Sequence, residues 1–89
     1  MTYRERIESR LTAAFQPVSL EIRDDSHKHK GHVGHRPEGE THFHVRIVSA
    51  AFEGQNRVNR QRAIYRELKA EMEERVHALS LEVLTPAEA

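Results

Sequence analysis

Histidines are the residues of this chain whose type and spacing suggest chemistry. The sequence has 89 residues and seven histidines, and four of these fall between Ser26 and His35, in a stretch that also holds Gly31 and Gly34. Neutral imidazole is the commonest metal ligand of proteins and suits iron, copper, nickel and zinc. The four follow neither a helical nor a strand period, so we expect an exposed loop that presents imidazoles; a solvated polar loop merely rich in histidine is the alternative. They are His27, His29, His32 and His35.

Three further histidines lie outside this stretch. His77 opens the last strand expected in the chain, directly after the preceding helix, and capping of that helix by a cationic side chain is an alternative to metal ligation. His42 and His44 are two residues apart and share the outward face of an expected strand, where they could form a bidentate pair. Outward strand positions are polar in most half-buried sheets, so we interpret both as ordinary surface residues.

Composition excludes several kinds of site. The chain has no cysteine, which excludes a disulfide framework, a thiolate nucleophile and a Cys-ligated zinc finger. Iron–sulfur clusters depend on cysteine thiolates, so any cluster bound here is expected to be shared with a partner. Lys plus Arg equals Asp plus Glu at 14 each, and this balance gives no support to nucleic-acid binding by bulk charge.

Patterns of hydrophobicity predict a soluble protein. No apolar run approaches the roughly 20 residues needed to cross a bilayer, and no signal-like apolar core follows the first residues, so we expect no membrane partner. Hydrophobic residues make up 37% of the chain and charged residues 31%, with a mean hydropathy of -0.76. We expect a cytoplasmic single domain over residues 1–89, with an ordered core at about residues 2–84 and a long flexible loop at about residues 25–41.

Two helices and three strands are expected to position the histidines. Thr2 and Glu5 have the spacing of a capping box, which predicts a helix start. Helical and alternating apolar periods then predict helices over residues 2–16 and 56–75 and strands over residues 18–23, 42–49 and 77–84. A short helical turn is expected after the second strand. The predicted fold class is α+β, in the order αββαβ, with a three-stranded mixed sheet covered by helices on one face.

Five segments in this order resemble the BolA-like family. They are Glu21–Ser26 (EIRDDS), Glu40–Val45 (ETHFHV), Val48–Gly54 (VSAAFEG), Arg60–Tyr65 (RQRAIY) and Val76–Leu81 (VHALSL). The resemblance covers nearly the whole chain, from about Ile7 to Pro86, and implies a fold related to class II KH domains. One departure is that the family commonly has Arg-His-Arg where this chain has Arg60-Gln61-Arg62.

The resemblance also implies a partner and a cofactor. BolA-like proteins pair with monothiol glutaredoxins that carry a Cys-Gly-Phe-Ser site, and the pair holds a bridging [2Fe–2S] cluster. By resemblance His77 is one ligand of this cluster. The second ligand comes from the long loop, where His29 falls on the expected position when Ser26 is taken as the serine of the family. The neighbouring histidines that could substitute for it are His27, His32 and His35.

These implications predict a non-enzymatic adaptor in iron–sulfur and iron homeostasis. Glutathione and the glutaredoxin cysteine would fill the remaining cluster sites, and no cofactor is expected for the isolated chain, which is expected to be a monomer or a weak homodimer. No Ser/His/Asp arrangement, apolar carboxylate pair or phosphate loop points to an enzyme.

Nucleic-acid binding is the alternative function. Some BolA-like proteins act as transcriptional regulators, so DNA is a second implied partner. The expected second helix is locally basic in its first half, which could contact phosphates. Acidic residues are interspersed there, and no Gly-X-X-Gly clamp stands where KH domains use one. The candidate contacts are Arg57, Arg60, Arg62 and Arg66.

Overall fold

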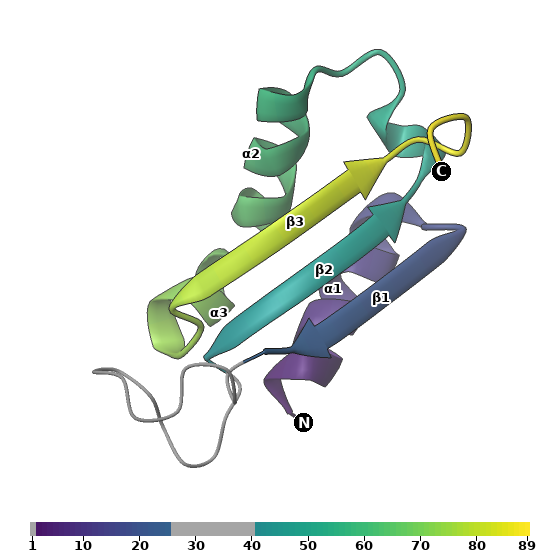
Figure 1. Ribbon diagram of the computed structural model, residues 1–89. Helices are drawn as coiled ribbons and strands as arrows, with labels where there is room; N and C mark the ends of the chain where they lie inside the picture. The colour runs from purple at the N-terminus through teal and green to yellow at the C-terminus, as the bar shows by residue number, and fades with distance from the viewer. Residues whose placement is uncertain (1, 26–40) are drawn as a thin grey trace.

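The computed structural model describes residues 2–25 and 41–89 (Figure 1). The first helix, α1, spans Tyr3–Phe15 and begins at the predicted capping box. The Glu5 N–H donates to Thr2 Oγ1 over 3.1 Å, and the Thr2 N–H donates to Glu5 Oε1 over 2.9 Å. Two backbone donors that a helix start would leave unpaired are thereby satisfied, and this part of the sequence prediction is confirmed.

Three strands form one sheet in the order β1-β2-β3. Strand β1 is Ser19–Asp24, β2 is His42–Val48 and β3 is Ala78–Leu84. The outer strand β1 runs antiparallel to β2, whereas β3 runs parallel to it. A parallel neighbour requires a crossover connection, which here contains the short 3₁₀ helix η2 (Ala50–Phe52) and the helices α2 (Arg57–Glu67) and α3 (Lys69–Glu74).

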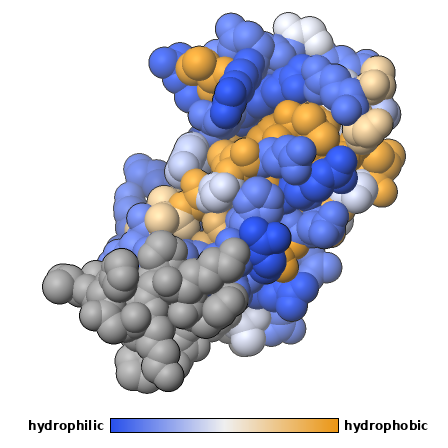
Figure 2. Space-filling model, in the orientation of Figure 1, coloured by the Kyte–Doolittle hydropathy of each residue, from blue (hydrophilic) through white to orange (hydrophobic). Residues whose placement is uncertain are grey.

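The helices cover one face of this sheet and leave the other face open (Figure 1). Along β2, Phe43, Val45 and Ile47 are at most 2% exposed and alternate with partly exposed polar residues, which is the pattern of a strand with one buried face. Figure 2 shows hydrophilic residues on the open face together with a band of hydrophobic residues that crosses it. The predicted fold class, an α+β fold with a three-stranded mixed sheet and helices on one face, is confirmed.

One element differs from the prediction. The single helix expected over residues 56–75 is two helices, α2 and α3, that meet at Leu68, whose dihedral angles of φ -101° and ψ 16° leave the helical range. The Leu68 side chain is 1% exposed, so the break accompanies its insertion into the core. The same change of direction places the buried Glu71 against α1, where its Oε2 lies 2.8 Å from nitrogens of Arg6 and of Arg10. The prediction of one continuous helix was wrong because it used only the local spacing of apolar residues, which carries no information on contacts with other helices.

The outer edge of β3 is covered by side chains of α2. The Tyr65 hydroxyl donates to the Leu79 carbonyl over 3.2 Å, and Arg60 Nη1 donates to the Val83 carbonyl over 3.1 Å. An uncovered strand edge is a template for pairing with another chain, and proteins commonly cover such edges. Arg60 and Tyr65 therefore occupy two carbonyl groups that a further strand would need.

Ion pairs with arginine lower the pKa of two carboxyl groups. The hydrogen bond from Arg6, followed by that from the Tyr3 hydroxyl, lowers the pKa of Glu74 from 4.5 to about 2. The hydrogen bond from Arg60, followed by that from the Thr85 N–H, lowers the pKa of Glu88 to about 2. The second pair ties the tail after β3 to α2.

Acid is therefore expected to weaken both links. A carboxylate whose folded-state pKa lies below its unfolded value of 4.5 stabilises the fold above about pH 4.5, and this contribution is lost as the pH falls towards about 2. The side chains of Glu74 and Glu88 are 47% and 44% exposed, so salt should weaken the effect. In thermal unfolding between pH 6 and pH 2, wild type should lose its advantage over Glu74→Gln as the pH falls. A constant difference between the two proteins would contradict the assignment.

Candidate functional site

His77 lies in the short connection between α3 and β3, with its side chain exposed. The backbone on both sides of it is fixed. The preceding residue, Val76, is 2% exposed, and its N–H donates to the Glu71 carbonyl over 3.0 Å. The His77 N–H donates to the Thr41 carbonyl over 2.7 Å, and the Ala78 N–H reaches the same carbonyl over 3.2 Å. The chain therefore holds the His77 backbone firmly while its imidazole faces solvent.

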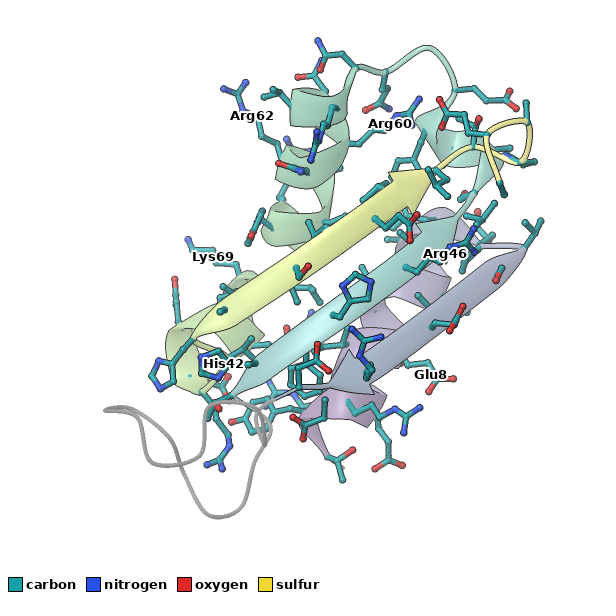
Figure 3. All side chains as sticks on the ribbon, in the orientation of Figure 1. Glu8, His42, Arg46, Arg60, Arg62 and Lys69 are labelled. Carbon is teal, nitrogen blue, oxygen red and sulfur yellow. The ribbon has the colours of Figure 1, made fainter. Side chains whose placement is uncertain are left out.

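A second imidazole stands beside His77. The rings of His42 and His77 have centroids 6.3 Å apart and an interplanar angle of 49°. His42 is the first residue of β2 and pairs in parallel register with Ala78 of β3, which brings the residue before β3 to its side. Figure 3 shows His42 at the end of the sheet where β2 begins.

Thr41 links the two histidines. It is fully buried; its carbonyl accepts the His77 N–H, and its hydroxyl oxygen lies 2.9 Å from His42 Nδ1. The interpretation of His42 as an ordinary surface residue missed this arrangement. The signal was present in the sequence: parallel pairing of the second and third strands would have placed the histidine at the start of one beside the histidine before the other.

The four clustered histidines, His27, His29, His32 and His35, lie outside the described residues. The structure does describe where the chain enters and leaves their segment. Asp25 precedes it, and its N–H donates to the His42 carbonyl over 2.7 Å; Thr41 follows it. Asp25 and Thr41, the described residues that flank 26–40, thus lie at the end of the sheet that carries His42 and His77.

Within residues 2–25 and 41–89, no group of three or more His, Cys, Asp or Glu side chains is arranged to hold a metal ion. This part of the chain contributes the two imidazoles of His42 and His77 at the sheet end. A complete coordination sphere there would take further ligands from residues 26–40, from a partner or from solvent.

The four arginines predicted to contact nucleic acid differ in their surroundings. Arg60 has a side chain only 14% exposed, which donates to the carbonyls of Gln55 and Val83 and pairs with Glu88 at 2.6 Å. Its role here is to connect α2 with β3 and the tail. The other three are exposed on α2, and Figure 3 shows one of them, Arg62, pointing away from the sheet. The exposed arginines are Arg57, Arg62 and Arg66.

None of the helices over the described residues is long and apolar enough to span a lipid bilayer.

Several known proteins are similar in sequence to this chain. The family described as BolA-like protein matches residues 11–88. The chain is 47% identical over 85 residues to the DNA-binding transcriptional regulator BolA of Escherichia coli (strain K12), in a match that covers 96% of this chain and 77% of that protein. It is 44% identical over 86 residues to Protein BOLA1, chloroplastic, of Arabidopsis thaliana, covering 94% of this chain and 54% of the relative. The chain thus spans about half the length of that plant protein.

Solved structures share its fold. The BolA domain of SufE1 from Arabidopsis thaliana superposes with a TM-score of 0.90 at 44% identity, covering 100% of this chain and 98% of that one. BolA1 from Arabidopsis thaliana gives the same TM-score at 38% identity and the same coverage. The agreement extends over the whole arrangement of strands and helices described above.

Proposed function

The chain belongs to the BolA-like family, and on that basis we propose that it is a non-enzymatic adaptor that pairs with a monothiol glutaredoxin and co-ligates a [2Fe–2S] cluster, within iron–sulfur and iron homeostasis. The observation that carries the proposal is the exposed His77, whose backbone N–H is bound by the carbonyl of Thr41, the residue that follows the histidine-rich stretch in the sequence. A cluster shared in this way would give an iron-responsive complex that neither partner forms alone.

The donor set of the chain fits such a cluster. Imidazole nitrogen ligates iron, and histidines replace two cysteines on one iron of Rieske-type [2Fe–2S] centres. The chain has no cysteine, so sulfur ligands would have to come from the partner and from glutathione. In the proposed complex His77 holds the cluster together with His29, or with another histidine of residues 26–40. When bound, the cluster supplies a one-electron centre and transferable iron and sulfide.

The residues around His77 would act before any cluster arrives. The Thr41 carbonyl accepts the His77 N–H, and the buried Val76 is bonded through its N–H to the Glu71 carbonyl of α3. A ligand held by its own backbone loses little conformational freedom on binding, so less of the binding free energy is spent on ordering it. The exposed position of the imidazole leaves it accessible to a partner surface.

Co-expression with a monothiol glutaredoxin tests the proposal. We expect a coloured heterodimer whose visible circular dichroism spectrum differs from that of the cluster-bound glutaredoxin homodimer. The matched control is the same glutaredoxin with its active-site cysteine replaced by serine, which should give a colourless mixture. Copurification without a distinct spectrum, or the homodimer spectrum alone, would refute shared ligation.

Nucleic-acid binding is the second candidate function, because a relative 47% identical to this chain is named a DNA-binding transcriptional regulator. Arg57, Arg62 and Arg66 are exposed along α2, and within the described part of the chain no acidic side chain forms an ion pair with them. Such arginines could neutralise phosphates. Arg60 is less suited to this role because its guanidinium already pairs with Glu88.

Filter binding at several salt concentrations distinguishes this candidate. If α2 binds DNA, Arg62→Ala and Arg66→Ala should each weaken binding and reduce the slope of log affinity against log salt by about 1, the amount expected for one lost phosphate contact. Lys69→Ala, which removes an exposed cation of α3, is the matched control. Binding that is absent at physiological salt, or that none of these substitutions changes, would count against the candidate.

A further inference from the structure

The proposed function gives His77 a role but gives none to His42, whose imidazole lies beside it. We infer that His42 and His77 together form a two-imidazole site for a first-row transition metal ion, and that Thr41 positions His42 within it. Where the ion is an iron of the shared cluster, this inference rests on the proposed function; binding of a free ion does not. His42 lies in β2, outside the histidine-rich segment.

The separation of the rings agrees with a shared ion. A bond between a metal and a histidine nitrogen is about 2.0–2.1 Å long, so two imidazoles on one ion have centroids no more than about 6.5 Å apart. The observed 6.3 Å lies just inside this limit, which is reached only when the two nitrogens are nearly opposite each other across the ion, so a smaller angle requires the rings to move closer; the interplanar angle of 49° leaves them unstacked. Because His77 is exposed, its ring can rotate to improve the angle at the ion without disturbing the core.

Thr41 supplies the support that metal-binding histidines usually have. In most metal sites the ring nitrogen that does not bind the metal is held by a hydrogen bond, which fixes the ring orientation. The Thr41 hydroxyl oxygen lies 2.9 Å from His42 Nδ1, which assigns metal binding to Nε2. Thr41 is fully buried, so this support is held in place by the surrounding core.

The backbone keeps the two histidines together in the absence of a ligand. His42 pairs with Ala78 in the parallel register of β2 and β3, and the His77 N–H donates to the Thr41 carbonyl. Separating the imidazole-bearing residues would break these bonds and open one end of the sheet. The site is therefore preorganised, which favours binding of a metal ion by only two protein ligands.

The chemistry of the donors selects the class of ion. Two imidazole nitrogens suit Cu²⁺, Ni²⁺ and Zn²⁺, whereas Mg²⁺ and Ca²⁺ prefer oxygen ligands. Copper(II) binds nitrogen sites most tightly among the divalent ions of the first row, so it is the most sensitive probe. Its electron paramagnetic resonance spectrum also reports the number of bound nitrogens.

Copper(II) titration of the full chain without any partner tests the inference. The background variant replaces the four histidines of the 26–40 segment by alanine, which leaves His42, His44 and His77. We expect one copper ion with two nitrogens bound. His42→Ala and His77→Ala should each lower the affinity at least about tenfold and remove one nitrogen from the spectrum; Thr41→Val should lower the affinity about tenfold, and Thr41→Ser should restore it.

His44→Ala is the matched control, because His44 lies two residues along the same face of β2 and contacts Ser80 instead. This substitution should change the affinity less than twofold. Equal losses from His42→Ala and His44→Ala, or an affinity that does not change in His42→Ala, would overturn the inference. Because no glutaredoxin is present, the copper result stands or falls independently of the heterodimer experiment. Circular dichroism of each variant confirms that it is folded.

Discussion

Replacing His77 by alanine is expected to abolish the spectrum that distinguishes the glutaredoxin heterodimer from the glutaredoxin homodimer. The substitution removes the proposed cluster ligand but leaves intact the backbone hydrogen bond from residue 77 to the Thr41 carbonyl. Loss of supporting groups around a bound metal already costs about tenfold to a hundredfold in affinity, and loss of a ligand should cost at least as much. The measurement is the visible circular dichroism spectrum of the copurified complex, with its rate of decay.

The control for this experiment is a histidine that the sheet places elsewhere. His44→Ala removes an imidazole from the open face of β2, where it contacts Ser80, and should leave the heterodimer spectrum unchanged. Because the side chain of His77 is exposed, His77→Ala should unfold at the temperature of wild type. A heterodimer spectrum that is unchanged in His77→Ala would show that His77 is not a cluster ligand and would contradict the proposed function.

The sequence predicted the elements whose evidence is local. The capping box of Thr2 and Glu5 and the alternation of Phe43, Val45 and Ile47 both follow from residues a few positions apart, and the structure contains both. The resemblance to the BolA-like family agreed with the order of these elements, and the comparisons confirmed it. The fold class was therefore accessible before any coordinates.

Two features that depend on contacts between distant segments were not predicted. The proximity of His42 to His77 results from the parallel register of β2 with β3, and the break at Leu68 accompanies the burial of Leu68 and Glu71 against other elements. Periodicity within one helix gives no information on which charged residue another helix will bury. The ligand role of His29 stays a prediction, since this residue lies outside the described part of the chain.

Glu71 is the clearest case of a residue whose burial could not be predicted from the neighbouring sequence. Its side chain is fully buried in α3. Oε2 receives hydrogen bonds from Arg6 and Arg10 of α1, over 3.0 and 2.8 Å, whereas Oε1 is buried with no hydrogen-bond partner among the described residues. The Glu71 carbonyl also accepts the Val76 N–H, next to His77. This buried carboxylate therefore anchors the segment that carries the proposed ligand.

The arginines and Glu71 should contribute unequally to stability. The side chains of Arg6 and Arg10 are 24% and 46% exposed, so both can be hydrated if Glu71 is lost, whereas the Glu71 side chain is 0% exposed and we expect it to stay buried if the arginines are lost. A buried charge left without its partner costs about 3–5 kcal/mol, while replacing a whole buried ion cluster by apolar side chains is often neutral or stabilising. The change in stability therefore depends on which of the three residues are replaced.

The double variant Arg6→Met/Arg10→Met is accordingly expected to be much less stable than the triple variant that also carries Glu71→Met. Relief of the stranded carboxylate should raise the unfolding temperature of the triple variant above that of the double by at least about 10 °C, since 1 kcal/mol shifts a domain of this size by about 4–8 °C. Both variants lack the contacts of Arg6 with Tyr3 and Glu74, so the comparison isolates Glu71. Thermal unfolding at pH 7 gives the measurement. A triple variant no more stable than the double would mean that Glu71 becomes hydrated once its arginines are lost, and the expected cost of an unpaired buried carboxylate would be refuted.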